Sequence, residues 1–167
     1  KVNASFFSHT AYPSELERTD RSLWEDGTRV PMIIVGPGVT KGKVCNKPVQ
    51  LLDIYPTLLS LTGLKDDDQL EGHSLAGLLT DPEADWPHMA RTSFGPGNYS
   101  IRSERYRYIH YNDGTEELYD HSDDPHEWKN LINHPDMATT LAQHRTFLPK
   151  TSHPILGSDS TGHKAFN

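Results

Sequence analysis

The residues that can carry acid–base, nucleophilic or metal chemistry are scattered along this chain. His9, His73, His110 and His121 show neither a His-x-His nor an HExxH spacing, so the sequence predicts no metal cluster. The single cysteine, Cys45, excludes an internal disulfide, and we expect a half-buried structural thiol. Neither residue type predicts a self-contained catalytic centre.

A β-hairpin is predicted within residues 101–120. Asp113-Gly114 is a dipeptide that favours a two-residue type I′ turn. The register that follows pairs Asn112 with Thr115, Ile109 with Leu118, Tyr108 with Tyr119, His110 with Glu117 and Arg107 with Asp120. Apolar residues then face apolar residues and opposite charges meet, which stabilises cross-strand pairing.

The remaining side chains of this hairpin have structural interpretations. We expect Tyr106, Tyr108 and Tyr119 to lie in the core of the sheet, and Arg105 and Arg107 to form the solvated face of their strand. Tyrosines exposed along one surface would instead indicate a carbohydrate-binding module.

This stretch resembles the C-terminal region of the sulfatases of the alkaline-phosphatase superfamily. In that family R-x-x-R-Y-R-Y-I leads through a hairpin to E-L-Y-D and D-P-x-E-x-x-N-L, which here are residues 102–109, 117–120 and 124–131. The blocks LWEDGTRVPMIIVGPG, LLDIYPTLLSLTG and EGHSLAGLL, at residues 23–38, 51–63 and 71–79, are also similar to family segments. The resemblance covers most of residues 21–148.

The resemblance implies hydrolysis of a sulfate ester, plausible substrates being sulfated sugars, by an intact enzyme with a formylglycine nucleophile and calcium. The chain holds no C-x-P-S-R, no paired N-terminal Asp and no D-H-G before residue 21. We therefore expect calcium and formylglycine in an N-terminal sulfatase region, which is the expected partner of this chain. No catalytic residue, metal ligand or cofactor is expected within the 167 residues, and the chain alone should be inactive.

One residue of the family's sulfate site should fall inside this chain. The family usually carries Lys four positions before the aromatic residue that matches Trp24, but that position is Asp20, which would repel sulfate. Arg18 or Arg21 would supply the cation from a neighbouring position, or both are surface arginines on an irregular lead-in. Asp20 also fits an inactive relative or an incomplete gene product.

The glycine-rich turn from Gly95 to Ser100 is the second candidate for substrate contact. Relatives often carry a polar G-N-x-x turn near the pocket mouth, and Asn98 with Tyr99 would fill that role. The same turn is equally well explained as a strand connector.

The predicted fold class is α+β, as the C-terminal piece of an α/β sulfatase fold. A short buried strand and a helix precede a small antiparallel sheet with a packed C-terminal helix. The apolar run MIIVG after Pro31 predicts the strand, and Asp53 is expected to cap a helix over residues 54–62 that Gly63 ends. Its apolar face would be Leu58, Leu59 and Leu61, and that of the last helix Met137, Leu141, Phe147 and Leu148.

Three segments are expected: residues 1–63 as lead-in plus the last strand and helix of the large domain, 64–149 as the antiparallel subdomain, and 150–167 as a tail. A hydrophobic content of 34% is low, so either much of the chain is loop or part of its apolar surface is completed by something outside this chain. The first residue is Lys, which predicts a trimmed or upstream start site.

The net charge of −7 argues against nucleic acid or an anionic membrane as partner. The resemblance implies a periplasmic, secreted or lysosomal protein. Three alternatives remain open: a phosphodiesterase or phosphonate monoester hydrolase of the same superfamily, a non-catalytic carbohydrate-binding or interaction module, and one chain of a processed two-chain sulfatase.

Overall fold

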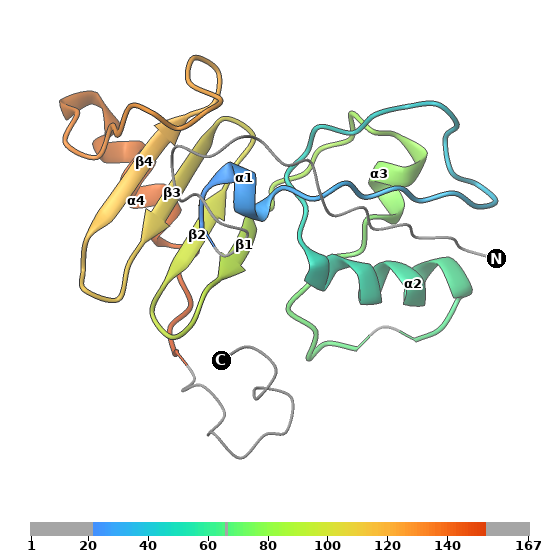
Figure 1. The fold of residues 1–167 in the computed structure, drawn as a ribbon. Helices are drawn as coiled ribbons and strands as arrows, with labels where there is room; N and C mark the ends of the chain where they lie inside the picture. Colours follow the sequence, from blue (N-terminus) through green and yellow to red (C-terminus); the bar gives the residue numbers. More distant parts are fainter. Residues whose placement is uncertain (1–21, 66, 153–167) are drawn as a thin grey trace, which may run out of the picture.

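The computed structural model describes residues 22–65 and 67–152, whose elements are drawn in Figure 1. The first part holds α1 (Glu25–Thr28), the 3-10 turn η1 (Leu51–Asp53), α2 (Ile54–Thr62) and α3 (Ala76–Thr80). The strands β1 (Ala90–Ser93), β2 (Tyr99–Arg102), β3 (Tyr106–His110) and β4 (Glu116–Asp120) follow, and η2 (Pro135–Met137) and α4 (Ala138–Arg145) come last. The α+β order expected from the sequence is confirmed.

The four strands form one antiparallel sheet in the order β1-β2-β3-β4. Because neighbouring strand residues point to opposite faces, the sheet has two apolar sides. Ile101, Tyr108 and Leu118 pack with Leu141 of α4 on one side. The other side carries Ile109 and Tyr119, which pack against Leu23 and Trp24 at the start of α1. The sheet is therefore covered on both faces, and α1 is part of that cover (Figure 1).

The β3–β4 register differs by one residue from the predicted one. Tyr108 lies opposite Leu118 and His110 opposite Glu116, and the amide of Tyr111 donates to the carbonyl of Thr115 at 3.0 Å. The loop therefore has three residues and ends with Gly114 at φ +84°, the geometry of a turn followed by a bulge. The carboxylate of Asp113 accepts the Thr115 amide at 2.9 Å, which favours this longer loop. The predicted pairs His110–Glu117 and Arg107–Asp120 were wrong.

The core positions of the hairpin are confirmed despite the register shift. Tyr108 and Tyr119 are buried, and Tyr106 packs against the cluster of Ile101 and Leu118. Tyrosines in the core cannot form the exposed sugar-binding surface of the alternative interpretation.

Residues 32–36, expected to form a strand buried on both faces, neither form a strand nor are buried in this chain. Ile33 is 52% exposed and Val35 is 62% exposed. The described residues offer no neighbouring strand to which this run could hydrogen-bond. The predicted apolar face of α2 is also open, since Leu58 and Leu61 are exposed.

The start of α2 is tied to the loop before α3 rather than capped as predicted. The carboxylate of Asp53 accepts the amide of Gln50 at 2.9 Å and that of His73 at 2.8 Å, and it makes no cap to the α2 backbone. Gly72 lies so close to Leu52 that a Cβ would fall 2.0 Å from its carbonyl oxygen. Gly63, at φ +68°, ends α2 as predicted.

Two further observations concern the surface. Cys45 is exposed, so the expectation of a half-buried thiol was wrong; its thiol donates to the carbonyl of Pro82 at 3.5 Å. No described helix has the length and apolar character that a membrane crossing requires.

Candidate functional site

Arg107, in the middle of β3, has the most unexpected environment in the sheet. It was expected on a solvated face, but its side chain is 3% exposed because α1 and the loop after β4 cover it. The guanidinium donates to the hydroxyl of Ser100 at 2.6 Å and to the carbonyl of Leu23 at 3.3 Å. It also pairs with the carboxylates of Glu25 and Glu127, the latter at 2.6 Å from Nε to Oε1.

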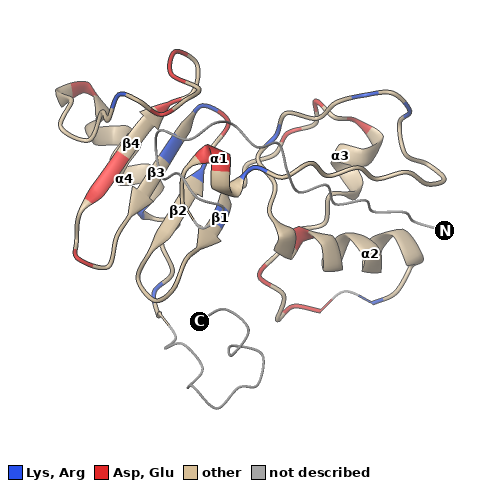
Figure 2. Cartoon of the chain, in the orientation of Figure 1, with Lys and Arg blue, Asp and Glu red and all other residues tan. Residues whose placement is uncertain are grey.

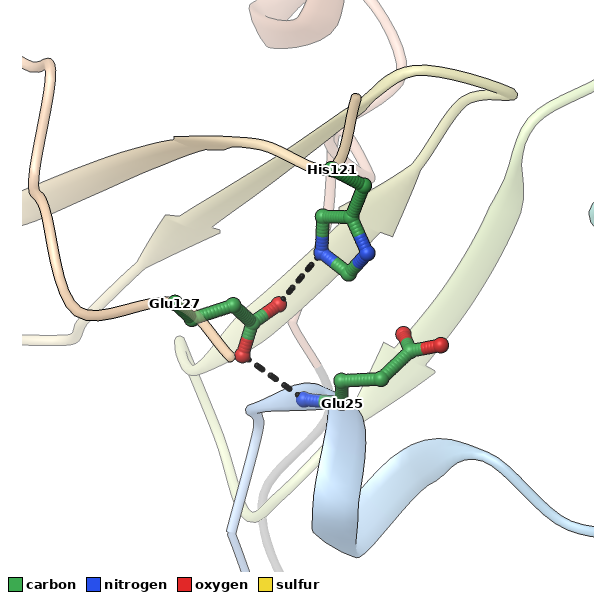
Figure 3. A group of neighbouring side chains, drawn as sticks. All are labelled: Glu25, His121 and Glu127. Carbon is green, nitrogen blue, oxygen red and sulfur yellow. Dashed lines mark hydrogen bonds and ion pairs between the residues drawn. The ribbon is translucent and has the colours of Figure 1, made fainter. Parts of the chain in front are cut away.

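Glu127 is the buried carboxylate that pairs with Arg107. It is 1% exposed and is the one described non-glycine residue with positive φ, at 58°. Its carboxylate accepts the backbone amide of Glu25 at 2.8 Å and contacts Nε2 of His121 at 2.8 Å (Figure 3). A left-handed conformation is unfavourable for a glutamate, so the surrounding contacts must hold it in place.

These contacts form a set that we call the buried ion network: Glu25, Arg102, Arg107, His121 and Glu127. Figure 2 shows charges of both signs where α1 meets the sheet. Burial raises the pKa of Glu25, but Arg107 and Arg102 outweigh it and hold the pKa below its ordinary value. Burial, together with Arg107, lowers the pKa of Arg102. The network therefore pairs opposite charges in a largely buried environment.

Glu25, His121 and Glu127 also have the composition of a cation site. One ligand atom from each lies within 4.8 Å of the others. Arg107, however, already places a guanidinium against both carboxylates. A metal ion would have to enter against that positive charge, so these residues fit an internal ion network better than a metal centre.

An open hollow of about 470 Å³ lies beside the network. Its lining comprises Glu25, Arg29, Arg102, Glu104, Arg105, His121, Ser122 and Pro125. Arg105 binds Asp120 through two nitrogens, and this lowers the pKa of Asp120 to about 2. Arg29 is the most solvent-facing of the arginines, and its pairing with Glu25 is loose at 3.7 Å. The hollow is open, and its arginines suit an anionic or hydroxylated group.

The residues predicted to contact substrate lie in different environments or outside the described part of the chain. Arg18 and Arg21 lie outside the described residues. Asn98 is half-buried, and its side chain accepts the amide of Asn112 at 3.1 Å and donates to the carbonyl of Pro96 at 3.2 Å. Tyr99 is buried in β2. In this chain Asn98 therefore joins two loops of the sheet, and its contact with substrate stays a prediction.

The buried ion network was missed in the sequence, although all its members except His121 were within the blocks that carry the family resemblance. Glu25 follows Trp24, and Glu127 is the glutamate of D-P-x-E-x-x-N-L. The local sequence carries no signal for the network, because Glu25 and Glu127 meet Arg107 only in the folded chain.

Comparisons with known proteins agree with this geometry. The family model described as "N-sulphoglucosamine sulphohydrolase, C-terminal" matches residues 18–153. The chain belongs to the sulfatase family. A sulfatase from Formosa agariphila is 40% identical over 131 residues, which cover 78% of this chain and 26% of that protein. A delta 4,5-hexuronate-2-O-sulfatase from Bacteroides thetaiotaomicron is 36% identical over 142 residues, covering 76% and 29% of the two chains.

Solved structures place the sulfatase chain in the same fold. A 2-O GAG sulfatase superposes with a TM-score of 0.60 at 31% identity, over 75% of this chain and 30% of that one. A phosphonate monoester hydrolase from Silicibacter pomeroyi reaches a TM-score of 0.58 at 23% identity, which shows a common fold alone. This sulfatase chain spans between a quarter and a third of the length of the relatives it matches.

Proposed function

We propose that this chain is the supporting C-terminal region of an enzyme that hydrolyses a sulfate ester of an acidic sugar. The nucleophile, a formylglycine, and calcium would belong to an N-terminal sulfatase region. The observation that carries this proposal is that residues 30–35 have no neighbouring strand within the described part of the chain, and that α2 leaves Leu58 and Leu61 exposed. Apolar surface of this extent is normally covered by protein.

The exposed side chains that would meet the N-terminal region come from two segments. They are Val30, Ile33, Val35, Leu51, Leu52, Tyr55, Leu58 and Leu61. In a parallel sheet, a strand buried on both faces reads as a continuous apolar run, as MIIVG does. Strand pairing and helix packing by the N-terminal region would bury both segments together.

The residues of this chain would contribute by holding the segment before α1 in a defined position. Trp24 donates from Nε1 to Glu117 at 2.8 Å, and the amide of Glu25 donates to Glu127 at 2.8 Å. Both acceptors belong to the β4 region, so the sheet fixes the chain at residues 24–25. The arginines proposed to contact sulfate, Arg18 and Arg21, come directly before this anchored point. The sheet would thus set where that preceding segment begins.

The substrate class follows from the named relatives and the hollow. Two relatives carry names that specify a 2-O-sulfated hexuronate or glycosaminoglycan. Such a sugar carries a carboxylate as well as the sulfate. Arg29 and Arg102 at the hollow offer cationic donors of the kind that bind carboxylates. We therefore favour a 2-O-sulfated hexuronate over a neutral aryl sulfate.

The test is hydrolysis by the complete reading frame that contains this sequence. We expect release of sulfate from a 2-O-sulfated unsaturated uronate disaccharide, with little release of alcohol from an aryl phosphonate monoester. A preference for the phosphonate would contradict the proposal and favour the phosphonate monoester hydrolase alternative.

A further inference from the structure

The loop between β4 and η2 holds two aromatic rings on the outside of the molecule. Trp128 is 77% exposed, more than any other large hydrophobic side chain in the described part of the chain. The exposed His126 stacks on it, with ring centroids 5.0 Å apart and planes at 21°. We call these two side chains the aromatic pair.

The residue between the two rings explains why the pair is held in place. Glu127 is buried, with its carboxylate fixed by Arg107, His121 and the amide of Glu25. On either side of it, the amide of Lys129 donates to the carboxylate of Asp124 at 2.7 Å. The loop is therefore fixed from inside, and little ordering would be needed before a ligand could bind the rings.

The surroundings indicate what covers the aromatic pair. Protein-docking surfaces are contiguous apolar patches, and the other large exposed hydrophobic side chains lie at residues 30–64 and at Phe94. The residues that follow Trp128 in the chain, Lys129 and Asn130, are instead polar and exposed. A flat ring amid polar groups matches a ligand with an apolar face and a hydroxylated edge. A pyranose ring has both features.

We propose that the aromatic pair is a stacking site for a pyranose ring of the carbohydrate. This inference rests on the proposed function and adds a sugar contact that uses the ring face rather than the sulfate. Trp128 would supply the apolar plane, the stacked His126 would hold it, and the exposed Lys129 that follows it in the chain would donate to a sugar hydroxyl.

Titration calorimetry of this chain with hyaluronan and heparin hexasaccharides tests the proposal, because one is unsulfated and the other highly sulfated. Trp128→Ala should raise the dissociation constant for both by about tenfold. Phe94→Ala, which removes another exposed aromatic ring, should change neither. Circular dichroism checks that both variants keep the fold.

Three results would overturn the proposal: unchanged binding by Trp128→Ala, an equal loss in Phe94→Ala, or wild-type chain that binds neither sugar. Binding of heparin alone that Lys129→Ala removes would mean a charge contact and would also overturn it. Sulfate release by the complete enzyme tests the proposed function separately, so the two failures are distinguishable.

Discussion

Arg107 and Glu127 form an ion pair at 2.6 Å with side chains only 3% and 1% exposed. The pair joins the centre of the sheet to the loop after β4, and Glu25 brings α1 to the same point. Charges buried to this degree are tolerated only as partners, because each alone would carry an uncompensated desolvation penalty. The packing of α1 on the sheet therefore depends on both Arg107 and Glu127.

Glu127→Gln removes one charge of that pair and should destabilise the chain strongly. Arg107 would be left with Glu25 alone, and breaking a buried pair typically costs about 3 kcal/mol or more. Urea unfolding measures the change in free energy. The matched control is Glu104→Gln, since Glu104 pairs with Lys47 at 2.7 Å on the surface and should lose less than about 1 kcal/mol. Equal effects of the two variants would contradict the prediction.

Asp120 should make the chain acid-sensitive. Arg105 lowers its pKa to about 2 from 3.8, so its stabilising contribution is complete above about pH 4 and is lost as the pH falls toward 2. Because Arg105 is largely exposed to solvent, we expect this pair to contribute only a small part of the stability of the chain. Asp120→Asn should flatten the fall in the urea midpoint between pH 5 and 2 that wild type shows. Asp136→Asn, at an exposed position, should leave the wild-type profile intact.

Tyr108, Tyr111 and Tyr119 should ionise late in the folded chain. Burial raises the pKa of each, and the nearby carboxylates Glu116 or Glu117 raise it further. The unfolded chain loses these protons above about pH 10 while the folded chain retains them, so stability falls as the pH rises beyond that value. A phenolate absorbance titration should show two phases that merge in urea. A single phase in the folded chain would contradict this assignment.

The sequence predicted the presence of the sheet correctly but not the register of its hairpin. The two strands of the hairpin followed from the Asp113-Gly114 turn, and the packed last helix followed from its apolar residues, of which Leu141 is buried. The hairpin register was wrong because the Asp113-Gly114 dipeptide does not by itself decide between two-residue and three-residue loops. The bond from the Asp113 carboxylate to Thr115, 2.9 Å to its amide, accompanies the longer loop.

The buried ion network was beyond prediction for a different reason. Strand alternation puts Arg107 on the face of Ile109 and Tyr119, but the cover of that face comes from residues far apart in sequence. Glu25 and Glu127 reach Arg107 only after α1 and the β4–η2 loop fold onto the sheet. No local pattern contains that information.

Ile33 and Val35 show the opposite case, in which the apolar pattern predicted burial that this chain does not provide. If the N-terminal region covers them, Ile33→Ser and Val35→Ser should change the stability of this chain by less than about 0.5 kcal/mol. Leu118→Ala, in the core, should cost about 2–5 kcal/mol. Urea unfolding of the three variants compares them. A loss in Ile33→Ser as large as that in Leu118→Ala would mean that Ile33 packs within this chain.

The most direct test of the proposed supporting role of this chain is turnover of an aryl sulfate by the purified chain with calcium present. We expect no hydrolysis above the uncatalysed rate, because in the proposed function the ester-cleaving groups would belong to the N-terminal region. A rate that stays proportional to this chain through successive purification steps would contradict it.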